Sequence, residues 1–335
     1  MKKILITGAG GFIGSFLVEK SLGSGFDTWA GVRKSTSREF LGDTRIRFTD
    51  LPFHNSVKLK ESLLRHKEEH GGWDIIIHNL GVTKCTDPKD FDRINYGFVR
   101  NFADMLRETE MVPEQFILMS SLGALGPGDE TGMTPIRRDD EPAPNTAYGR
   151  SKLKAENYLR SLDAFPFVFI RPTGVYGPRE KDYLLMVKTI KSGLDFGAGF
   201  KPQRITFIYV KDLVDCVFKV IEKEVTRQAY IVAEGADYSS SDFRRFAQKE
   251  LNKRFVLPVT VPLFVLKGVS LISEKIARLT GKPSTLNSDK YNIMKQRNWI
   301  CDITPLREEL GFVPSYNLEE GVRETIAWYR KNHWI

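Results

Sequence analysis

The chain has 335 residues, of which 41% are hydrophobic and 27% are charged, and its formal net charge at pH 7 is +8. This length suits one large α/β unit or two coupled domains, and the composition is ordinary for a globular protein. The Lys and Arg residues are scattered, without a run of five or six, which favours a solvated basic surface over nucleic-acid binding.

Short β-branched runs alternate with amphipathic segments of helix length, a pattern typical of a parallel sheet with covering helices. We predict strands over 3–7, 27–32, 46–50, 74–78, 115–120, 167–171, 205–210 and 229–233. We predict helices over 13–24, 56–69, 88–110, 147–162, 180–193, 211–223, 239–251 and 318–331. The expected fold is a Rossmann-type, doubly wound α/β sheet with a smaller C-terminal α/β region.

The regular alternation of predicted strands and helices ends at residue 171, which suggests two functional regions. Residues 1–171, together with 203–233, are expected to form a dinucleotide-binding domain. Residues 172–202 and 234–335 are expected to form a substrate-binding region over the carboxyl ends of the strands, where open α/β sheets bind ligands.

Two features bear on the compartment. The three cysteines are far apart and none lies in a CxxC, which indicates a reducing compartment, and we expect the cytoplasm. No stretch approaches the roughly 18 apolar residues of a membrane span. The nearest, 257–279, is interrupted by Lys267, Glu274 and Lys275. It also fits an amphipathic helix that lines a substrate pocket or touches a membrane surface.

A glycine-rich turn follows the first predicted strand and opens a helix. Gly8, Gly11 and Gly14 have GxxGxxG spacing, which allows a tight turn, a close approach of the backbone to a pyrophosphate, and close packing of helix on strand. The phosphates would face the amides at the start of the helix, at Phe12 and Ile13. The alternative is a glycine-rich turn that binds no ligand.

The end of the second strand bears on the choice between NAD and NADP. NAD-binding chains usually place an acidic residue there for the ribose 2′-hydroxyl, but this chain has Arg33, Lys34 and Ser35. A guanidinium suits a 2′-phosphate, so NADP is favoured. In the alternative, Arg33 stacks on adenine and both cofactors bind.

A tyrosine and a lysine lie one helical turn apart in "YGRSK", at Tyr148 and Lys152. On a helix they share a face, and an ammonium beside a phenol favours the phenolate. Such a tyrosine can act as a general acid or base near neutral pH. Ser120 and Ser121, at the end of the fifth predicted strand, can supply a hydroxyl that holds the substrate oxygen.

With these motifs in place, the chain resembles the extended short-chain dehydrogenase/reductase family, the NAD-dependent epimerase/dehydratase group. The resemblance covers nearly the whole length: "TGAGGFIG" (7–14), Asp50-Leu51, "HNLG" (78–81), the serine pair, "YGRSK" (148–152), "RPTGVYGPR" (171–179), "FIYVKDLV" (207–214), "WICDITPLREELGF" (299–312) and "LEEGVRETIAWYR" (318–330).

The resemblance implies a catalytic triad of Ser121, Tyr148 and Lys152. Tyr148 would move the proton, Ser121 would hold the substrate oxygen, and Lys152 would lower the pKa of the tyrosine and hold the nicotinamide ribose. Hydride would pass between the substrate carbon and the nicotinamide. The resemblance also implies cofactor contacts at Asp50, which meets the adenine in the family, and at Leu51, Leu80, Gly81, Pro172 and Val175.

Departures from the family pattern restrict the reactions and substrates that are expected. Dehydratases carry an Asp-Glu pair where this chain has Leu122 and Gly123, so a dehydratase mechanism is not expected. Nucleotide-sugar epimerases usually have Asn at Gly174, which weakens that assignment without excluding it. Short likenesses to dihydroflavonol-reductase-like and 3β-hydroxysteroid-dehydrogenase-like members, with the apolar segment 257–279, favour a less polar substrate.

Several other residues admit both a functional and a structural interpretation. For His78, Cys85 and Tyr176 the structural interpretation leads. Candidate substrate contacts are Thr83, Lys84, Ser121, Leu122, Thr173, Gly174, Arg179 and Arg204, although the two arginines fit an ordinary surface as well. The histidines and acids show no metal-binding spacing, and no metal site is expected.

We therefore expect an NAD(P)-dependent oxidoreductase or epimerase that interconverts a secondary alcohol and a ketone on a sugar nucleotide or similar hydroxylated small molecule. The alternatives are an NADPH-dependent reductase of a less polar substrate and, in a different class, a non-catalytic dinucleotide sensor. Family members commonly dimerise through helices that correspond to 88–110 and 147–162, so we expect a homodimer.

Overall fold

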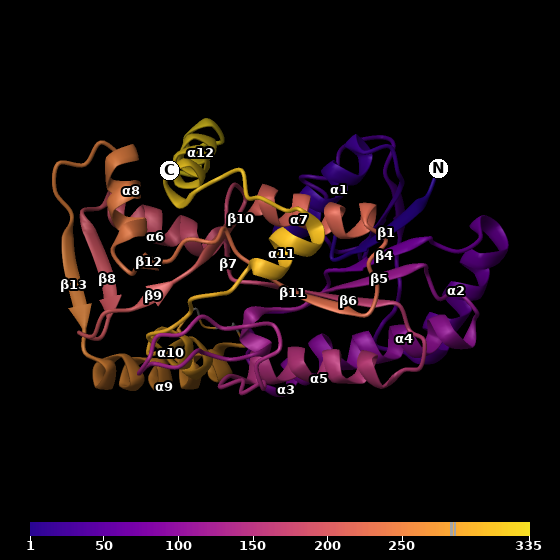
Figure 1. Cartoon of the computed structure of the whole chain (residues 1–335), viewed down its shortest axis with the longest axis horizontal. Coiled ribbons are helices and arrows are strands. Elements are labelled where there is room, and N and C mark those ends of the chain that lie inside the picture. The colour runs from indigo at the N-terminus through magenta and orange to yellow at the C-terminus, as the bar shows by residue number, and fades with distance from the viewer. Residues whose placement is uncertain (282–283, 285) are drawn as a thin grey trace. The chain divides into compact units, whose positions relative to one another are not determined.

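The computed structural model describes residues 1–281, 284 and 286–335 (Figure 1). Its contacts divide the chain into two compact units. The first unit contains residues 1–124, 147–171 and 214–230, and the second contains 125–146, 172–213 and 231–335. The assignment of cofactor binding to an N-terminal domain and of substrate binding to a C-terminal region stays a prediction.

A seven-stranded sheet forms the centre of the first unit, with the order β11-β6-β5-β4-β1-β2-β3. The pairs from β6 through β3 are parallel, which confirms the expected Rossmann-type α/β class. Strands such as β4 and β5 are buried along their whole length because helices cover both faces of the sheet. The strands are β1 (Lys3–Thr7), β2 (Asp27–Gly31), β3 (Arg47–Thr49), β4 (Ile75–His78), β5 (Gln115–Met119), β6 (Phe167–Pro172) and β11 (Gln228–Val232).

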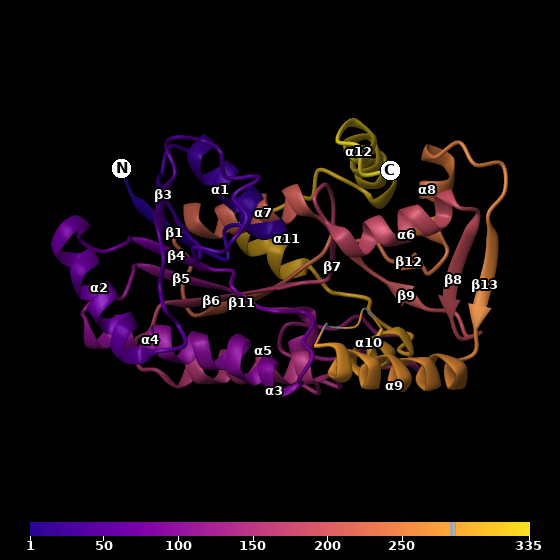
Figure 2. The same cartoon turned by 180° about the vertical axis from the view of Figure 1, so that it is seen from behind.

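Helices lie on the two faces of this sheet (Figures 1 and 2). One face carries α1 (Phe12–Gly23) and α7 (Val210–Glu222), and the other carries α2 (Ser56–His70), α4 (Phe98–Glu108) and α5 (Ala147–Ser161). The helix predicted over 88–110 is not continuous. It consists of α3 (Lys89–Phe91), a π-helix (η1, Asp92–Gly97) and α4. The wider π turn lets Asn95 point its amide into the unit.

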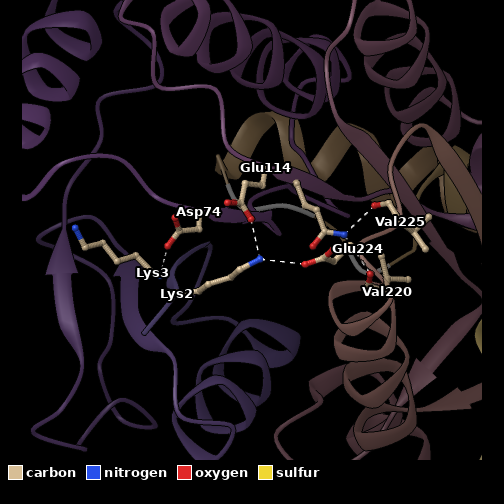
Figure 3. Close-up of polar contacts among 8 residues, drawn as sticks. Lys2, Lys3, Asp74, Glu114, Val220, Glu224 and Val225 are labelled. Carbon is tan, nitrogen blue, oxygen red and sulfur yellow. Dashed lines mark hydrogen bonds and ion pairs between the residues drawn. The ribbon is translucent and has the colours of Figure 1, made fainter.

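Polar contacts join the amino-terminal side of the sheet to its neighbours (Figure 3). Lys2 Nζ lies 2.8 Å from Glu114 Oε2 and 3.4 Å from Glu224 Oε1, and the Lys3 amide donates to Asp74 at 2.6 Å. The buried Gln115 amide donates to the Val220 carbonyl in α7 at 3.1 Å and to the Val225 carbonyl just after that helix at 2.8 Å. These contacts lie at the opposite end of the strands from the glycine turn.

The second unit is built from short strand pairs and helices around an aromatic core. Tyr176, Phe207 and Phe243 are among its buried residues. The pairs are β10–β7, β12–β9 and β13–β8. The strands are β7 (Gly174–Tyr176), β8 (Leu194–Ala198), β9 (Arg204–Ile205), β10 (Phe207–Tyr209), β12 (Tyr238–Ser239) and β13 (Leu257–Val261). The helices are α6 (Lys181–Lys191), α8 (Asp242–Glu250), α9 (Leu263–Thr280), α10 (Ser288–Met294), α11 (Thr304–Leu310) and α12 (Leu318–Lys331).

The strand predicted over 205–210 is wrong as one element. It splits at Thr206 into β9, which pairs antiparallel with β12, and β10, which pairs parallel with β7. The two halves have different partner strands, and between them the Thr206 hydroxyl donates to the Trp299 carbonyl at 2.8 Å. Among the described residues, no helix is both long and apolar enough to cross a membrane.

The packing of α1 on β1 generates the first prediction. A Cβ on Gly14 would lie 2.1 Å from the carbonyl oxygen of Gly8, so a methyl group there must push backbone apart. We expect Gly14→Ala to lower the free energy of unfolding by about 1–3 kcal/mol in urea denaturation. The matched control is Gly23→Ala in the same helix, where nothing lies within 4 Å of the added carbon. It should leave stability unchanged or raise it by up to about 1 kcal/mol. Equal effects of the two changes would contradict the packing argument.

Candidate active site

The turn between β1 and α1 has the geometry of a phosphate cradle. Gly8 has a φ of +65°, in the region that favours glycine. Gly11 precedes α1 and has no side chain that can cap it. The amides of Phe12, Ile13 and Gly14 therefore begin the helix without intrahelical acceptors. These residues fit the pyrophosphate of a dinucleotide, which is favoured by the positive end of a helix dipole.

The loop that follows β2 packs against this turn. A Cβ on Gly10 would lie 2.5 Å from Thr36 Cγ2 and 2.8 Å from the Ser37 carbonyl oxygen. The side chains at 33–35 are exposed beside it, and the Arg33 carbonyl accepts from the Thr36 amide at 2.9 Å. After β3, Asp50 is exposed and Leu51 is buried in the core.

The loop that follows β4 reaches the proposed catalytic lysine. The Leu80 amide donates to Thr7 Oγ1 at 3.2 Å, which fixes the start of the loop. A Cβ on Gly81 would lie only 3.2 Å from Lys152 Nζ. The structure thus brings a predicted cofactor contact, Gly81, next to Lys152.

Asn95 was missed by sequence reasoning. It is buried in the π-helix, its Oδ1 accepts from the Val82 amide at 2.8 Å, and its Nδ2 donates to the Val82 carbonyl and to Ser151 Oγ, both at 3.0 Å. It therefore ties the loop after β4 to α5. A π-helical turn inside a helix is often found at functional sites, but its position is not visible in the sequence.

His78, at the end of β4, is fully buried and lies 3.2 Å from Thr7 Oγ1 through its Nδ1. Burial lowers its pKa to about 3, and the charge of Lys152 acts in the same direction. A histidine held neutral in this way is a structural residue of the sheet, in line with the favoured interpretation of the sequence.

The side chains of Ser121, Tyr148 and Lys152 meet at the carboxyl end of β5. Ser121 follows that strand and hydrogen-bonds to Tyr148, and its Oγ accepts from the Gly123 amide at 3.1 Å. Lys152 is buried, its Nζ donates to the Met119 carbonyl at 2.8 Å, and it lies 5.9 Å from the centre of the Tyr148 ring. The geometry brings a hydroxyl, a phenol and an ammonium to the same end of β5.

Burial shifts the pKa values of Tyr148 and Lys152 in opposite directions. Burial raises the pKa of Tyr148, and the hydrogen bond from Ser121 only partly opposes it. Burial lowers the pKa of Lys152 to about 8, against the charge of Glu156. The sequence predicted a lowered pKa for Tyr148. In this structure desolvation of the phenolate dominates and raises the pKa of Tyr148, whereas the lowering assigned to Lys152 and the oxidised nicotinamide stays a prediction.

A buried ion pair supports the proposed triad and was also missed. Arg171 on β6 donates to both oxygens of Glu156, at 3.1 and 2.6 Å, and Ser120 Oγ donates to Glu156 Oε1 at 2.5 Å. Glu156 is 0% and Arg171 2% exposed. Because Ser120 is bonded to Glu156, Ser121 is the member of the serine pair that is turned to Tyr148.

The remaining candidates in the first unit lie in two loops. Thr83 is exposed, and Lys84 and Cys85 are half-buried, in the loop between β4 and α3. Leu122 is buried in a short 3₁₀ helix (η2, Leu122–Ala124). A Cβ on Gly123 would lie 3.3 Å from Ser121 Oγ, so this position lies against the proposed triad without carrying a functional group.

In the second unit, the place of the family's asparagine is already filled. A Cβ on Gly174 would lie 2.6 Å from the Tyr183 hydroxyl. Tyr176 is fully buried in the aromatic core, as expected for a packing residue. No substrate amide contact of the kind that an asparagine makes is available at 174.

The other candidates of the second unit have mixed surroundings. Arg204 forms an ion pair with Asp237, which occupies it in a structural contact. Arg179 has a φ of +74° and is half-buried. Pro172 is buried, Thr173 donates its amide to the Val232 carbonyl at 3.1 Å, and Val175 lies in β7. In the described part of the chain, no group of three or more His, Cys, Asp or Glu side chains is placed to hold a metal ion.

The buried ion pair generates the second prediction. Glu156→Gln removes the carboxylate and leaves the Arg171 charge buried without its partner. We therefore expect the free energy of unfolding, measured in urea, to fall by about 3–5 kcal/mol. Lys154→Gln, on the same helix, removes the exposed pair with Asp92 (2.8 Å) and the contact of the ammonium with the Tyr96 ring at 4.6 Å, and should change stability by less than about 1 kcal/mol. Adding Arg171→Met to Glu156→Gln should restore part of the loss. A Glu156→Gln protein as stable as the parent would refute this account.

Comparisons with known proteins show which family the chain belongs to. The model of the NAD dependent epimerase/dehydratase family matches residues 4–233. The UDP-glucose 4-epimerase of Vibrio cholerae is 27% identical over 97% of this chain and 94% of that protein. The ceramide reductase of Caulobacter vibrioides is 22% identical over 99% of this chain and 96% of that protein.

The fold is also similar to that of the UDP-glucose 4-epimerase of Thermus thermophilus, solved in complex with NAD. The TM-score is 0.77 at 18% identity, over 98% of this chain and 99% of that chain. This similarity concerns the fold, whereas the family model covers well over half of the sequence. The chain is therefore an enzyme of the NAD dependent epimerase/dehydratase family, within the extended short-chain dehydrogenase/reductase group.

Proposed function

We propose that the protein interconverts a secondary alcohol and a ketone with NAD(P), and that Tyr148 moves the proton at the substrate oxygen. The observation that carries this proposal is the hydrogen bond between Tyr148 and Ser121, with Lys152 Nζ 5.9 Å from the Tyr148 ring. Three polar groups that converge at the carboxyl end of β5 are what an acid–base step on a single oxygen requires.

The first unit supplies the residues that would hold the cofactor. The helix-start amides at 12–14 would bind the pyrophosphate, and Lys152 would bind the nicotinamide ribose beside Gly81. Bound nicotinamide would supply or accept the hydride.

The pKa directions suggest how Tyr148 works. A phenol whose pKa is raised by burial stays protonated and can donate to an oxygen that becomes negative, which is the step that reduction needs. In the opposite direction Tyr148 must accept a proton, and the Lys152 ammonium then stabilises the phenolate. Ser121, as a donor to the same region, holds the substrate oxygen near the phenol.

The third prediction tests the role of Tyr148. Tyr148→Phe removes only the hydroxyl, so kcat should fall by about 10²–10⁴-fold while the cofactor Kd stays within about threefold. Turnover is followed with UDP-glucose, by formation of its 4-epimer, and with a panel of ketones, by consumption of reduced nicotinamide.

The matched control is Tyr158→Phe, a tyrosine of the same helix whose hydroxyl bonds to Asp104. It should leave kcat unchanged. Turnover that survives in Tyr148→Phe, or that is lost equally in Tyr158→Phe, would overturn the assigned chemistry.

A second candidate is favoured by a specific observation in the second unit. Position 174 carries no amide, and a side chain there would meet the Tyr183 hydroxyl, which lies 2.6 Å from an added Cβ. This supports a reductase of a less polar substrate, and the similarity to a ceramide reductase supports it too. The similarity to a UDP-glucose 4-epimerase supports the nucleotide-sugar alternative. Identification of nucleotide released from denatured protein separates the two: retained NAD favours the epimerase, and an empty site that prefers NADPH favours the reductase.

The fourth prediction concerns the cofactor. We propose that NADP is preferred because Arg33 and Lys34 are exposed beside the glycine turn, in a loop without the usual acid. Arg33→Ala should weaken NADPH binding by about 10–100-fold, the factor expected when a charge-assisted hydrogen bond to the 2′-phosphate is lost. NADH has no 2′-phosphate, so its binding should be nearly unchanged.

The control for this prediction is Arg38→Ala, in the same loop, because that guanidinium stacks on Phe48 at 4.1 Å. Calorimetry or fluorescence titration gives both dissociation constants. Unmodified protein that binds NAD about tenfold more tightly than NADP would sink the NADP assignment.

Homodimerisation through the segments 88–110 and 147–162 also remains a proposal, and light scattering tests it.

A further inference from the structure

Helix α9 (Leu263–Thr280) of the second unit exposes a broad apolar face. Its inward positions, Leu266, Ser270 and Ala277, are buried against the unit, and α10 packs beside it (Figures 1 and 2). Seven of the nineteen large apolar side chains that are exposed in the described chain belong to this helix. They are Phe264, Val265, Val269, Leu271, Ile272, Ile276 and Leu279.

Five of these side chains form one row along the helix. Val265, Ile272 and Leu279 are spaced by seven residues, with Val269 and Ile276 between them, so they follow one side of the helix. Exposure reaches 60% at Ile272 and 87% at Leu279. Single exposed apolar residues are normal, but a row of this length beside an already packed face indicates a binding surface.

The charges beside this surface have one sign. The only acid of α9, Glu274, is turned to the unit, where it accepts from the Ser288 amide at 2.8 Å and from the Ser288 hydroxyl at 3.0 Å. Lys267 and Lys275, both on α9, are exposed. Apolar side chains with flanking cations match a lipid surface that has anionic headgroups above an apolar interior.

The same charges argue against a second copy of this chain as the occupant. A symmetric pairing of two α9 faces brings the lysines of one copy toward those of the other, and the outward face of α9 carries no acid to neutralise them. An anionic bilayer meets both the apolar and the charge requirement.

We propose that α9 is an interfacial helix that lies in the surface of a bilayer containing anionic lipids. Its apolar row enters the boundary between headgroups and acyl chains, and Lys267 and Lys275 contact the headgroups. This docking surface is independent of the reaction at Tyr148.

Co-sedimentation with vesicles tests the proposal on the full chain. We expect binding to vesicles of equal parts phosphatidylglycerol and phosphatidylcholine, and weaker binding to phosphatidylcholine alone or at high salt. Ile272→Glu combined with Leu279→Glu should weaken binding to the anionic vesicles by tenfold or more, since carboxylates replace the inserted groups. Lys267→Gln combined with Lys275→Gln should weaken it by roughly 30-fold, about fivefold per lysine.

The matched control is Val57→Glu on α2, which introduces a carboxylate at a side chain that is 66% exposed elsewhere. It should bind vesicles as the parent does, and circular dichroism checks that every variant is folded. Absence of vesicle binding by the parent, or equal binding by the double glutamate variant, overturns the proposal. A dimer in light scattering that the double glutamate variant dissolves, without vesicle binding, overturns it as well and assigns the face to a second copy.

Discussion

The buried pair of Glu156 and Arg171 fixes how α5 lies on the sheet. Charges removed from water must stay paired, so α5 cannot rotate or slide by a turn without stranding a carboxylate that is 0% exposed. Lys152 lies one turn before Glu156 on the same face, and Tyr148 lies one turn before Lys152. The position of the proposed acid–base pair therefore follows from an ion pair that need not touch the substrate.

The same carboxylate orients the end of β5. Ser120 donates to Glu156, and because successive side chains along an extended chain point to opposite sides, Ser121 faces the other way, toward Tyr148. Asn95 acts similarly on the loop after β4, which it holds against α5 through Val82 and Ser151. The site is thus built from buried polar contacts that are satisfied inside the protein, which is the condition for such groups to be stable there.

The sequence was sufficient for the features that depend on local pattern. β1, β4 and β5 were predicted within one or two residues because buried parallel strands appear as continuous apolar runs between turn residues. It was insufficient where distant residues decide the outcome. A lone acid such as Glu156 in an amphipathic helix suggests a solvated position until Arg171 is placed opposite it. The π-helix depends on what Asn95 contacts, and β8 pairs with β13, a segment some sixty residues later, in the register Leu194↔Leu257.

Burial at the proposed site makes a permanent negative charge on Tyr148 unfavourable, but it strengthens the interaction of Lys152 with a negative charge that develops nearby. It makes a phenolate at Tyr148 costly, and it lowers the pKa of Lys152 to about 8, so at neutral pH the ammonium persists in a poorly solvated place. The negative charge of Glu156 is already bonded to Arg171 and Ser120. A negative charge that develops on a substrate oxygen beside Tyr148 would therefore interact with the Lys152 ammonium in surroundings that screen it weakly. In the proposed reaction, the desolvation that keeps Tyr148 protonated would also strengthen the attraction between the Lys152 ammonium and a developing alkoxide.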